Sequence, residues 1–301
     1  MLNVLSLFDG ISCGQIALHK LGIKVNKYYA SEINKNSILI TKKNYPNTIQ
    51  LGDVRNIQTS ELPKINLLFG GSPCQSFSTI GNNKGFQGKS GLFYEYVRLL
   101  RKINPTYFLF ENVRMKKEWQ DIISTELGVE PIVINSSLVS AQNRIRLYWT
   151  NIPNIRLPFN KNIFLKDVVE NIVKPKLIRS FRNYVPNNFP LFVDPYNKSA
   201  INSGKSTTLR LNVFNGNMWI KCDNGYRNLT VKECEKLQTL PLGYTDIKNI
   251  SDSSKKKVIG DGWTVDVISH ILSHIPLAEN SKEDGIPPIK IGSFRKIKRK
   301  W

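Results

Sequence analysis

The sequence predicts an α/β fold in which helices cover both faces of a mostly parallel sheet, followed by a smaller, loop-rich domain. Short apolar runs and amphipathic stretches alternate through the first half of the chain, an order typical of strands joined by crossover helices. Six prolines between residues 153 and 195 accompany a change to irregular, Asn- and Lys-rich sequence. The second half is therefore expected to fold differently from the first.

Four runs are predicted as buried strands because they are short, rich in β-branched and aromatic residues, and bounded by turn-forming residues. They are residues 4–8, 27–31, 65–71 and 106–112. Stretches with helical spacing are residues 14–22, 34–44, 91–103, 229–240 and 264–275. In folds of this kind ligands bind at the carboxyl ends of the strands, so functional residues are expected just after each strand.

The chain of 301 residues has an ordinary globular composition but an unusual charge. Hydrophobic residues make up 41% and charged residues 22%, which excludes a disordered chain, a collagen-like chain and a disulfide mini-protein. Lys and Arg number 43 against 23 Asp and Glu, a net charge of +20. That excess favours a polyanionic partner such as nucleic acid, although an anionic membrane or an A/T-rich coding genome also explains lysines.

No apolar run approaches the roughly 18 to 20 residues of a membrane span, and the first ten residues lack a basic region before an apolar one. We expect a soluble, cytoplasmic protein without a membrane partner. The cysteines are too scattered for a disulfide framework and form no CxxC pair. They are Cys13, Cys74, Cys222 and Cys234. His270 and His274 lie one helical turn apart, but Ile271 stands where a metalloprotease motif has Glu, so no metal site is expected.

A tight turn with two glycines follows the first predicted strand. Phe8, Asp9 and Gly10 end the strand, and Gly14 lies where a helix begins. Glycines there allow a ligand to approach the backbone at a helix N-terminus, although packing alone also explains them. Glu32 follows the second strand, 23 residues after Asp9, a spacing at which a carboxylate binds ribose hydroxyls.

A further acidic residue, Asp53, lies in the turn Leu51-Gly52-Asp53-Val54 and is placed to accept a bond from an adenine amino group. With Glu32 and the glycine turn, it predicts an adenosine-containing ligand. The residues by themselves do not say which one.

Cys74 follows the strand at 65–71, where a buried structural thiol is out of place and a nucleophile is well presented. The alternative is a small apolar filler. Glu111 follows the next strand to the same edge, as a hydrogen-bond partner for a base or as a proton donor. Arg144 and Arg146 are two residues apart, so in a strand they point to one face and suit a phosphate or carbonyl oxygen.

In this order, the segments resemble the motif series of the DNA cytosine-5 methyltransferase family, and the resemblance covers nearly the whole chain. The segments are FDGxxxG, the Glu after the second strand, GDV, PCQSFS, GLFYEYVRLL, FENV, QNRIRLYW, LTVKECEKLQTLP and GDGWTVDVI. The compact length is similar to that of bacterial or phage members. The resemblance implies a Rossmann-like S-adenosylmethionine-dependent methyltransferase fold with a smaller target-recognition domain.

The resemblance further implies methyl transfer from S-adenosylmethionine to C5 of a flipped-out cytosine in a short duplex DNA site, with S-adenosylhomocysteine as product. Cys74 would attack C6 and form a covalent adduct, and Asn112 would brace its loop. Glu111 would hold N3 and the exocyclic amine, while Arg144, supported by Arg146, would hold the carbonyl oxygen. Residues implied to line the cofactor pocket are Phe8, Asp9, Gly10, Gly14, Glu32, Asp53, Gly262, Trp263 and Thr264.

We place a catalytic, cofactor-binding domain at residues 1–155, a small target-recognition domain at 156–257, and a C-terminal segment at 258–301 that returns to the catalytic domain. The recognition stretch, about 70 residues from 156 to 226, is expected to read a site of about two to five base pairs. Candidates for DNA contact are Arg179, Arg182, Lys198, Lys205, Thr207, Thr208 and Arg210.

Two other functions stay open at this point. One is a tRNA cytosine-5 methyltransferase with the same fold, whose Cys-Phe-Thr motif does not occur in the sequence. The other is a DNA-binding or regulatory module without activity, which the presence of Cys74, Glu111 and Arg144 argues against. We expect a monomer that binds double-stranded DNA, with a cognate restriction endonuclease in the same system as a candidate partner.

Overall fold

The computed structural model describes residues 1–73, 91–170, 191–194, 199–201, 204–209, 219–222 and 225–276. Its main sheet has seven strands, which are β1 (Leu2–Leu7), β2 (Val25–Ser31), β3 (Ile49–Gln50), β4 (Leu67–Gly70), β5 (Tyr107–Val113), β6 (Ile132–Asn135) and β7 (Ile145–Thr150). Their order is β3-β2-β1-β4-β5-β7-β6, and of these seven strands β7 alone runs in the direction opposite to the others. The predicted α/β fold with a mostly parallel sheet is confirmed.

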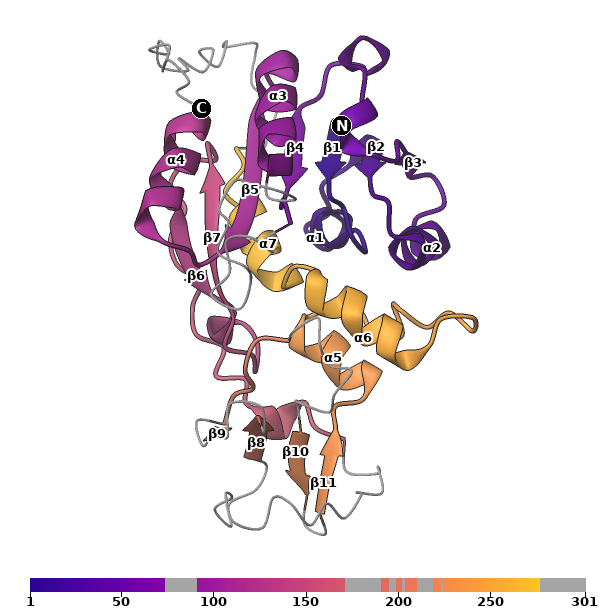
Figure 1. Cartoon of the computed structure of the whole chain (residues 1–301), viewed down its shortest axis with the longest axis vertical. Helices are drawn as coiled ribbons and strands as arrows, with labels where there is room; N and C mark the ends of the chain where they lie inside the picture. Colours follow the sequence, from indigo (N-terminus) through magenta and orange to yellow (C-terminus); the bar gives the residue numbers. More distant parts are fainter. Residues whose placement is uncertain are drawn as a thin grey trace.

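Helices cover both faces of this sheet (Figure 1). The helices of the main domain are α1 (Cys13–Lys20), α2 (Lys35–Asn44), α3 (Phe93–Ile103), α4 (Lys117–Leu127) and α7 (Val265–Leu272). One apolar cluster joins α1, α2 and α7 to the sheet, and a second joins α3 and α4 to the other face. Short 3₁₀ helices are Val54–Asn56, Thr59–Glu61, Ser136–Leu138 and Leu165–Asp167.

Local sequence explains why these segments are helical. In α3, Phe93, Tyr96, Val97 and Leu100 recur at helical spacing and are buried, so one side of the helix packs on the sheet. The helix ends at Asn104, which adopts a left-handed backbone with φ 46°. Burial of one apolar face with a polar opposite face is the pattern from which this helix was predicted.

The chain order of the strands reverses direction at one point of the sheet. From β1 the chain moves outward through β2 and β3, and it then returns to start β4 on the other side of β1. Helices that follow β1 and β4 therefore lie on opposite faces, and α/β folds bind their ligands beside such a reversal, at the carboxyl ends of the strands. The turn at Phe8 and the segment beginning at Gly71 follow these two strands directly.

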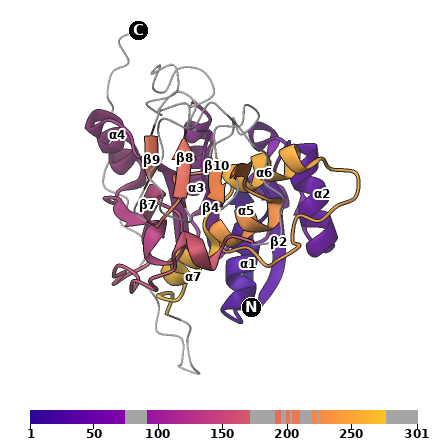
Figure 2. The same ribbon diagram turned by 90° about the horizontal axis from the view of Figure 1, so that it is seen from below.

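A second, antiparallel sheet is built from β8 (Leu191–Asp194), β9 (Ser199–Ile201), β10 (Trp219–Cys222) and β11 (Gly225–Asn228) in the order β11-β10-β8-β9. Helices α5 (Val231–Leu237) and α6 (Asp252–Asp261) lie between the two sheets (Figure 1), and the view from below shows α6 beside α2, which it contacts (Figure 2). Helix α6 continues across residue 257, so the second domain boundary that we predicted falls inside a helix.

No helix in the described ranges is long and apolar enough to cross a bilayer. Within the same ranges, no group of three His, Cys, Asp or Glu side chains is arranged to hold a metal ion. Cys13 and Cys234 are buried free thiols. Cys74 and the side chain of Cys222 lie outside the described part of the chain.

Candidate active site

The turn after β1 has an unusual backbone. Phe8, Gly10 and Ser12 all adopt left-handed conformations, with φ of 57°, 58° and 61°. Residues with a side chain pay a steric cost in this region, which proteins tolerate mainly at functional sites. A Cβ built on Gly10 meets no atom within 4 Å. The turn thus offers open space beside its backbone, as a ligand cradle requires.

The Glu32 carboxylate connects the turns after β1 and β2. Its Oε2 accepts a hydrogen bond from the Gly10 N–H at 2.7 Å, and its Oε1 accepts bonds from the N–H groups of Ile33 and Asn34, each at 2.7 Å. A carboxylate has about four acceptor sites, so capacity remains for one further donor such as a hydroxyl. The structure brings Glu32 to the predicted glycine turn.

Asp9, in the same turn, accepts bonds from two hydroxyl groups, one in the turn and one in β2. The hydroxyl groups of Ser12 and Tyr28 donate to its two carboxyl oxygens at 2.5 and 2.9 Å. Burial raises the pKa of Asp9 to about 6, repulsion from Glu32 adds to the rise, and these hydroxyl bonds oppose it. Asp9 therefore changes its charge in the weakly acidic range.

Asp53 behaves differently because it faces a cation. Arg55 makes side-chain and backbone hydrogen bonds to its carboxylate, which lower the pKa of Asp53 to about 2. Gly52, which precedes Asp53, accepts a hydrogen bond from Ser31 at its carbonyl oxygen. It has φ 71° and open space at its Cβ position. Of these two aspartates, Asp53 therefore stays ionised where Asp9 titrates.

Gly14 serves helix packing in the structure. A Cβ at this position would lie 2.7 Å from Cε2 of the Phe69 ring and 3.3 Å from the Tyr28 hydroxyl oxygen. Both neighbours are buried, so neither has room to move. The missing side chain lets α1 approach β4 and β2. Packing, which the sequence allowed as an explanation of the glycine beside ligand binding, therefore accounts for Gly14.

The Glu111 carboxylate has a donor on each oxygen at the end of β5. Arg146 Nε lies 2.9 Å from Oε1, and Trp263 Nε1 donates to Oε2 at 3.1 Å. The Arg146 and Glu111 side chains are only 12% and 11% exposed. A Cβ on Gly71 would lie 3.2 Å from both Oε2 and the Trp263 Nε1 atom, so a side chain there would press on this contact. Three distant chain segments meet here around one oriented carboxylate.

Arg144 has another partner. Its Nη2 donates to the Gly262 carbonyl oxygen at 2.9 Å, and the residue is 4% exposed. Because β7 begins at Ile145, Arg144 lies just before the strand and Arg146 within it. The two arginines contact different groups, with Arg146 on Glu111 and Arg144 on the C-terminal segment.

That segment, Gly262 to Thr264, packs tightly against the turn after β1. A Cβ on Gly262 would lie 3.1 Å from Cys13 Sγ. The Trp263 ring meets Phe69 edge to face at 5.9 Å, and Thr264 accepts a bond from Ser136 at 2.9 Å. Residues 262–264 of the predicted C-terminal segment thus contact the part of the main domain that follows β1.

The predicted nucleophile lies outside the described residues. Asn112, which follows Glu111, donates to both the carbonyl and the hydroxyl oxygen of Ser72 at 3.3 Å. This bond holds the end of the segment that leads through Pro73 to Cys74. Asn112 thus contacts Ser72, two residues before Cys74, where the expected bracing role requires a contact.

Lys205 and Thr208 are engaged in hydrogen bonds within the protein. Lys205 donates to three backbone carbonyl oxygens, including that of Ser140 at 3.0 Å. Thr208 donates to the carbonyl oxygen of Asn143 at 2.8 Å, and Thr207 is half-buried. The other candidates for DNA contact lie outside the described residues, namely Arg179, Arg182, Lys198 and Arg210.

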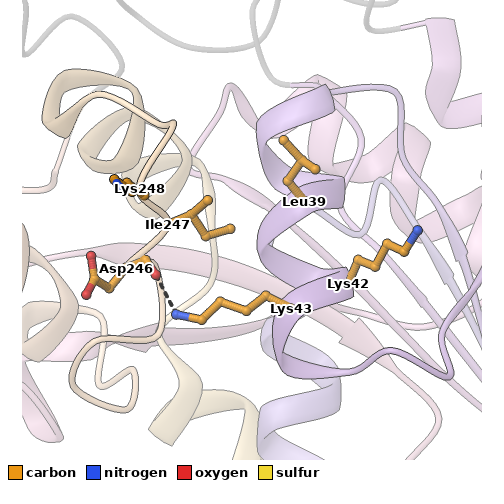
Figure 3. Close-up of a pocket in the computed structure, with 6 residues that line it drawn as sticks. All are labelled: Leu39, Lys42, Lys43, Asp246, Ile247 and Lys248. Atoms are coloured by element: carbon orange, nitrogen blue, oxygen red, sulfur yellow. Dashed lines mark hydrogen bonds between the residues drawn. The ribbon is translucent and has the colours of Figure 1, made fainter.

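Figure 3 shows an open groove of about 420 Å³ between α2 and the loop before α6. It is lined by Leu39, Lys42, Lys43, Asp246, Ile247 and Lys248. The Lys43 ammonium group donates to the Asp246 carbonyl oxygen across it. None of the predicted site residues lines this groove, so it is separate from the candidate active site.

Three residues at the site were missed from the sequence. Ile33, which directly follows Glu32, is apolar and yet 72% exposed. An apolar residue in a turn with functional residues was a signal in the sequence that could have identified it. Tyr28 lies in a predicted strand, but its bond to Asp9 has no local signature. Gln238 is buried beside Gly262, and its position in the helical segment 229–240 gave no indication of that contact.

A model of the family described as C-5 cytosine-specific DNA methylase matches residues 2–176. An orphan methyltransferase of Bacillus phage rho11s, M.Rho11sI, is 34% identical over 177 residues, which cover 58% of this chain and 34% of the phage protein. The match thus spans about a third of that relative. The type II methyltransferase M.Bsp6I of Bacillus sp. (strain RFL6) is 26% identical over 91% of this chain and 98% of its own.

Solved structures share the fold. The Entamoeba histolytica methyltransferase EhMeth superposes with a TM-score of 0.68 at 17% identity, covering 91% of this chain and 97% of its own. Spodoptera frugiperda DNMT2 gives 0.64 at 18% identity, covering 91% and 99%. At such identities the likeness concerns the fold alone.

Proposed function

Because the chain belongs to the family of C-5 cytosine-specific DNA methylases, we propose that it transfers a methyl group from S-adenosylmethionine to C5 of a cytosine in duplex DNA. The observation that carries the proposal is the Glu111 carboxylate, fixed by Arg146 and Trp263 beside the segment that leads to Cys74. A nearly buried, oriented carboxylate at the end of a central strand suits recognition of a base whose ring gains charge during reaction.

The turns after β1, β2 and β3 fit the proposed cofactor. Gly10 and Gly52 leave open space where side chains would project, and a cradle of this kind admits a ligand to the backbone. The carboxylates of Asp9, Glu32 and Asp53 supply acceptors for hydroxyl and amino groups and for positive charge. We propose that these residues, with Phe8 and the segment from Gly262 to Thr264, hold S-adenosylmethionine.

In the proposed reaction Cys74, as a thiolate, adds to C6 of the cytosine while the C5=C6 π bond opens toward C5. A free thiol has a pKa of about 8.5, so neighbouring positive charge would increase its thiolate fraction. S-adenosylmethionine supplies the electrophilic methyl group that C5 accepts, and S-adenosylhomocysteine is the product. Loss of the C5 proton to a base then restores the double bond and expels the Cys74 thiolate.

Glu111 is proposed to accept from the exocyclic amine and to hold the N3 edge of the cytosine. The Arg146 guanidinium lies against Oε1 of the carboxylate proposed to hold the base, while Arg144 secures Gly262. We therefore assign the contact to the cytosine carbonyl oxygen to Arg146 in preference to Arg144. The target carbon is inaccessible within a duplex, so the base must be flipped out, at a cost of a few kcal/mol.

The partner proposed for this reaction is double-stranded DNA. A net charge of +20 suits phosphate contacts that offset the cost of base flipping. Among the relatives, M.Bsp6I is a type II methyltransferase and M.Rho11sI an orphan one. If an endonuclease gene lies nearby and this chain protects host DNA from that endonuclease, the chain belongs to a restriction system. If no endonuclease gene lies nearby, the chain is a solitary methyltransferase.

The test is incubation of the protein with tritiated S-adenosylmethionine and duplex DNA, in parallel with tRNA. Label is expected in DNA, and bisulfite sequencing of DNA from an expressing host then identifies the site. Cys74→Ser is expected to abolish transfer and to retain DNA binding, and DNA with 5-fluorocytosine at the target is expected to form an SDS-resistant complex. Label in tRNA alone would replace the proposal with the tRNA enzyme, and label in neither would leave a binding module.

A further inference from the structure

The C-terminal end of α5 carries a fully buried amide side chain, Gln238, to which the proposed reaction assigns no role. The residue is 0% exposed and caps the helix within the segment 229–241. A buried amide is costly unless its donors and acceptors are satisfied. Its partners therefore show what this side chain holds together.

Each polar atom of the Gln238 amide has a partner. Its Nε2 donates to the carbonyl oxygens of Ile259 and Gly262, both at 3.0 Å. Its Oε1 accepts from Thr264 Oγ1 at 2.8 Å and from Gln142 Nε2 at 3.2 Å. One side chain thus connects the end of α6, the segment 262–264 and the residues that precede β7.

Two of these bonds lead directly to the candidate active site. The Gly262 carbonyl oxygen that accepts from Gln238 also accepts from Arg144 at 2.9 Å. The next residue, Trp263, donates its indole N–H to Glu111 at 3.1 Å. The segment has little room to shift, because Gly262 already lies against the Cys13 sulfur atom. A displaced Gly262 would carry the indole with it.

We propose that Gln238 is a positioning residue for the target base, which acts through Gly262 and Trp263 to hold the Glu111 carboxylate in its binding orientation. The inference rests on the proposed function, because it takes the cytosine as the ligand of Glu111. Gln238 contacts neither base nor cofactor in this scheme. Its effect on binding of the base passes through the direction of the Glu111 carboxylate, and this distinguishes it from a group that only stabilises the fold.

The test uses Gln238→Glu, which keeps the size of the side chain and an acceptor oxygen and removes the amide donor. Ser140→Ala is the matched control, because Ser140 is equally buried and donates to the carbonyl oxygen of Leu237, the neighbour of Gln238, at 2.6 Å. The control thus removes a hydrogen bond at the same helix end without touching Gly262. Melting temperatures of both variants establish that they are folded.

Affinity is measured with S-adenosylhomocysteine present for two duplexes. One contains the unmethylated target cytosine in the site that bisulfite sequencing identifies, and the other has an abasic site in place of that cytosine. Gln238→Glu is expected to weaken binding of the cytosine duplex about tenfold and to leave binding of the abasic duplex within about twofold. Ser140→Ala is expected to leave the ratio of the two affinities unchanged. In a Glu111→Gln background, the Gln238 substitution should cause no further loss of preference.

An equal loss on both duplexes, or an additive loss in the Glu111→Gln background, would overturn the inference and make Gln238 a structural residue. The same conclusion holds if Gln238→Glu and Gln238→Ala both melt below the assay temperature. A wild-type protein that methylates no DNA would instead refute the proposed function, so the two failures are distinct.

Discussion

Binding of S-adenosylhomocysteine is expected to weaken about tenfold between pH 8 and pH 5, because Asp9 takes up a proton in this range. Burial raises the pKa of Asp9 to about 6, and the nearby Glu32 charge acts in the same direction. The ligand carries an ammonium group, which binds a carboxylate better than a neutral carboxyl group. In the proposed cradle, the ionised form of Asp9 is therefore the one that binds.

The magnitude follows from the titration of a single group. With a pKa of about 6, Asp9 is almost fully ionised at pH 8 and only about a tenth of it is ionised at pH 5. If only the ionised form binds, the observed affinity falls by about the same factor of ten. The free energy of unfolding without ligand responds oppositely. Folding raises this pKa above 3.8, so the contribution of Asp9 to stability decreases as the pH rises from about 4 to about 6.

Calorimetric titration with S-adenosylhomocysteine at several pH values between 5 and 8 measures the effect. Asp9→Asn is expected to bind more weakly at pH 8 and to lose most of the pH dependence. Asp53→Asn is the matched control, because Arg55 keeps the pKa of Asp53 at about 2 and this carboxylate stays ionised throughout. Its loss is expected to weaken binding by the same factor at every pH.

A second carboxyl group near the cradle makes the experiment decisive. Burial also raises the pKa of Asp261, which precedes Gly262. If the pH dependence persists in Asp9→Asn and disappears in Asp261→Asn, the assignment to Asp9 is wrong. An affinity of the wild-type protein that is constant from pH 8 to pH 5 would refute the reasoning for both groups.

Two further substitutions test the packing around the site. Glu233→Ala is expected to lower the free energy of unfolding by about 3 to 5 kcal/mol in urea titrations, because it leaves the Arg227 guanidinium buried without the carboxylate that it now contacts at 2.6 Å. A loss below about 1 kcal/mol would contradict this. Gly71→Ala is expected to reduce kcat about tenfold at nearly constant melting temperature, because its Cβ would intrude between Glu111 and Trp263. Unchanged turnover would show that this contact is dispensable.

Strands β1, β2, β4 and β5 and helices α1, α2, α3 and α7 could be predicted because their signals are local, whereas β6 and α4 were not predicted. Helix α6 was missed, since its sequence DSSKKKVIGD is mostly polar and little of its surface is apolar. Only the cap at Ser251, which accepts from the Ser254 N–H, marks its start. This helix lacks an amphipathic pattern, and we attribute its stability to tertiary contacts with α2 and α5.

The positions of the site residues could be predicted from the ends of the strands, but their partners could not. Glu111 and Trp263 are 152 residues apart, and no local pattern joins them. The spacing of Arg144 and Arg146 suggested a shared target, yet β7 begins between them and each contacts a different segment. Such partners follow from the packing of whole elements, which a pattern along the chain does not contain.

One consequence of this packing concerns the relation between the two proposed ligands. Trp263 holds the carboxylate proposed to bind the base, and it belongs to the segment proposed to line the cofactor cradle. Its ring also packs on Phe69, whose strand leads toward Cys74. A displacement of Trp263 would therefore affect cofactor, base and nucleophile together. In the proposed scheme one indole ring thus connects the residues assigned to the cofactor, the base and the nucleophile, because Trp263 contacts both Glu111 of β5 and Phe69 of β4.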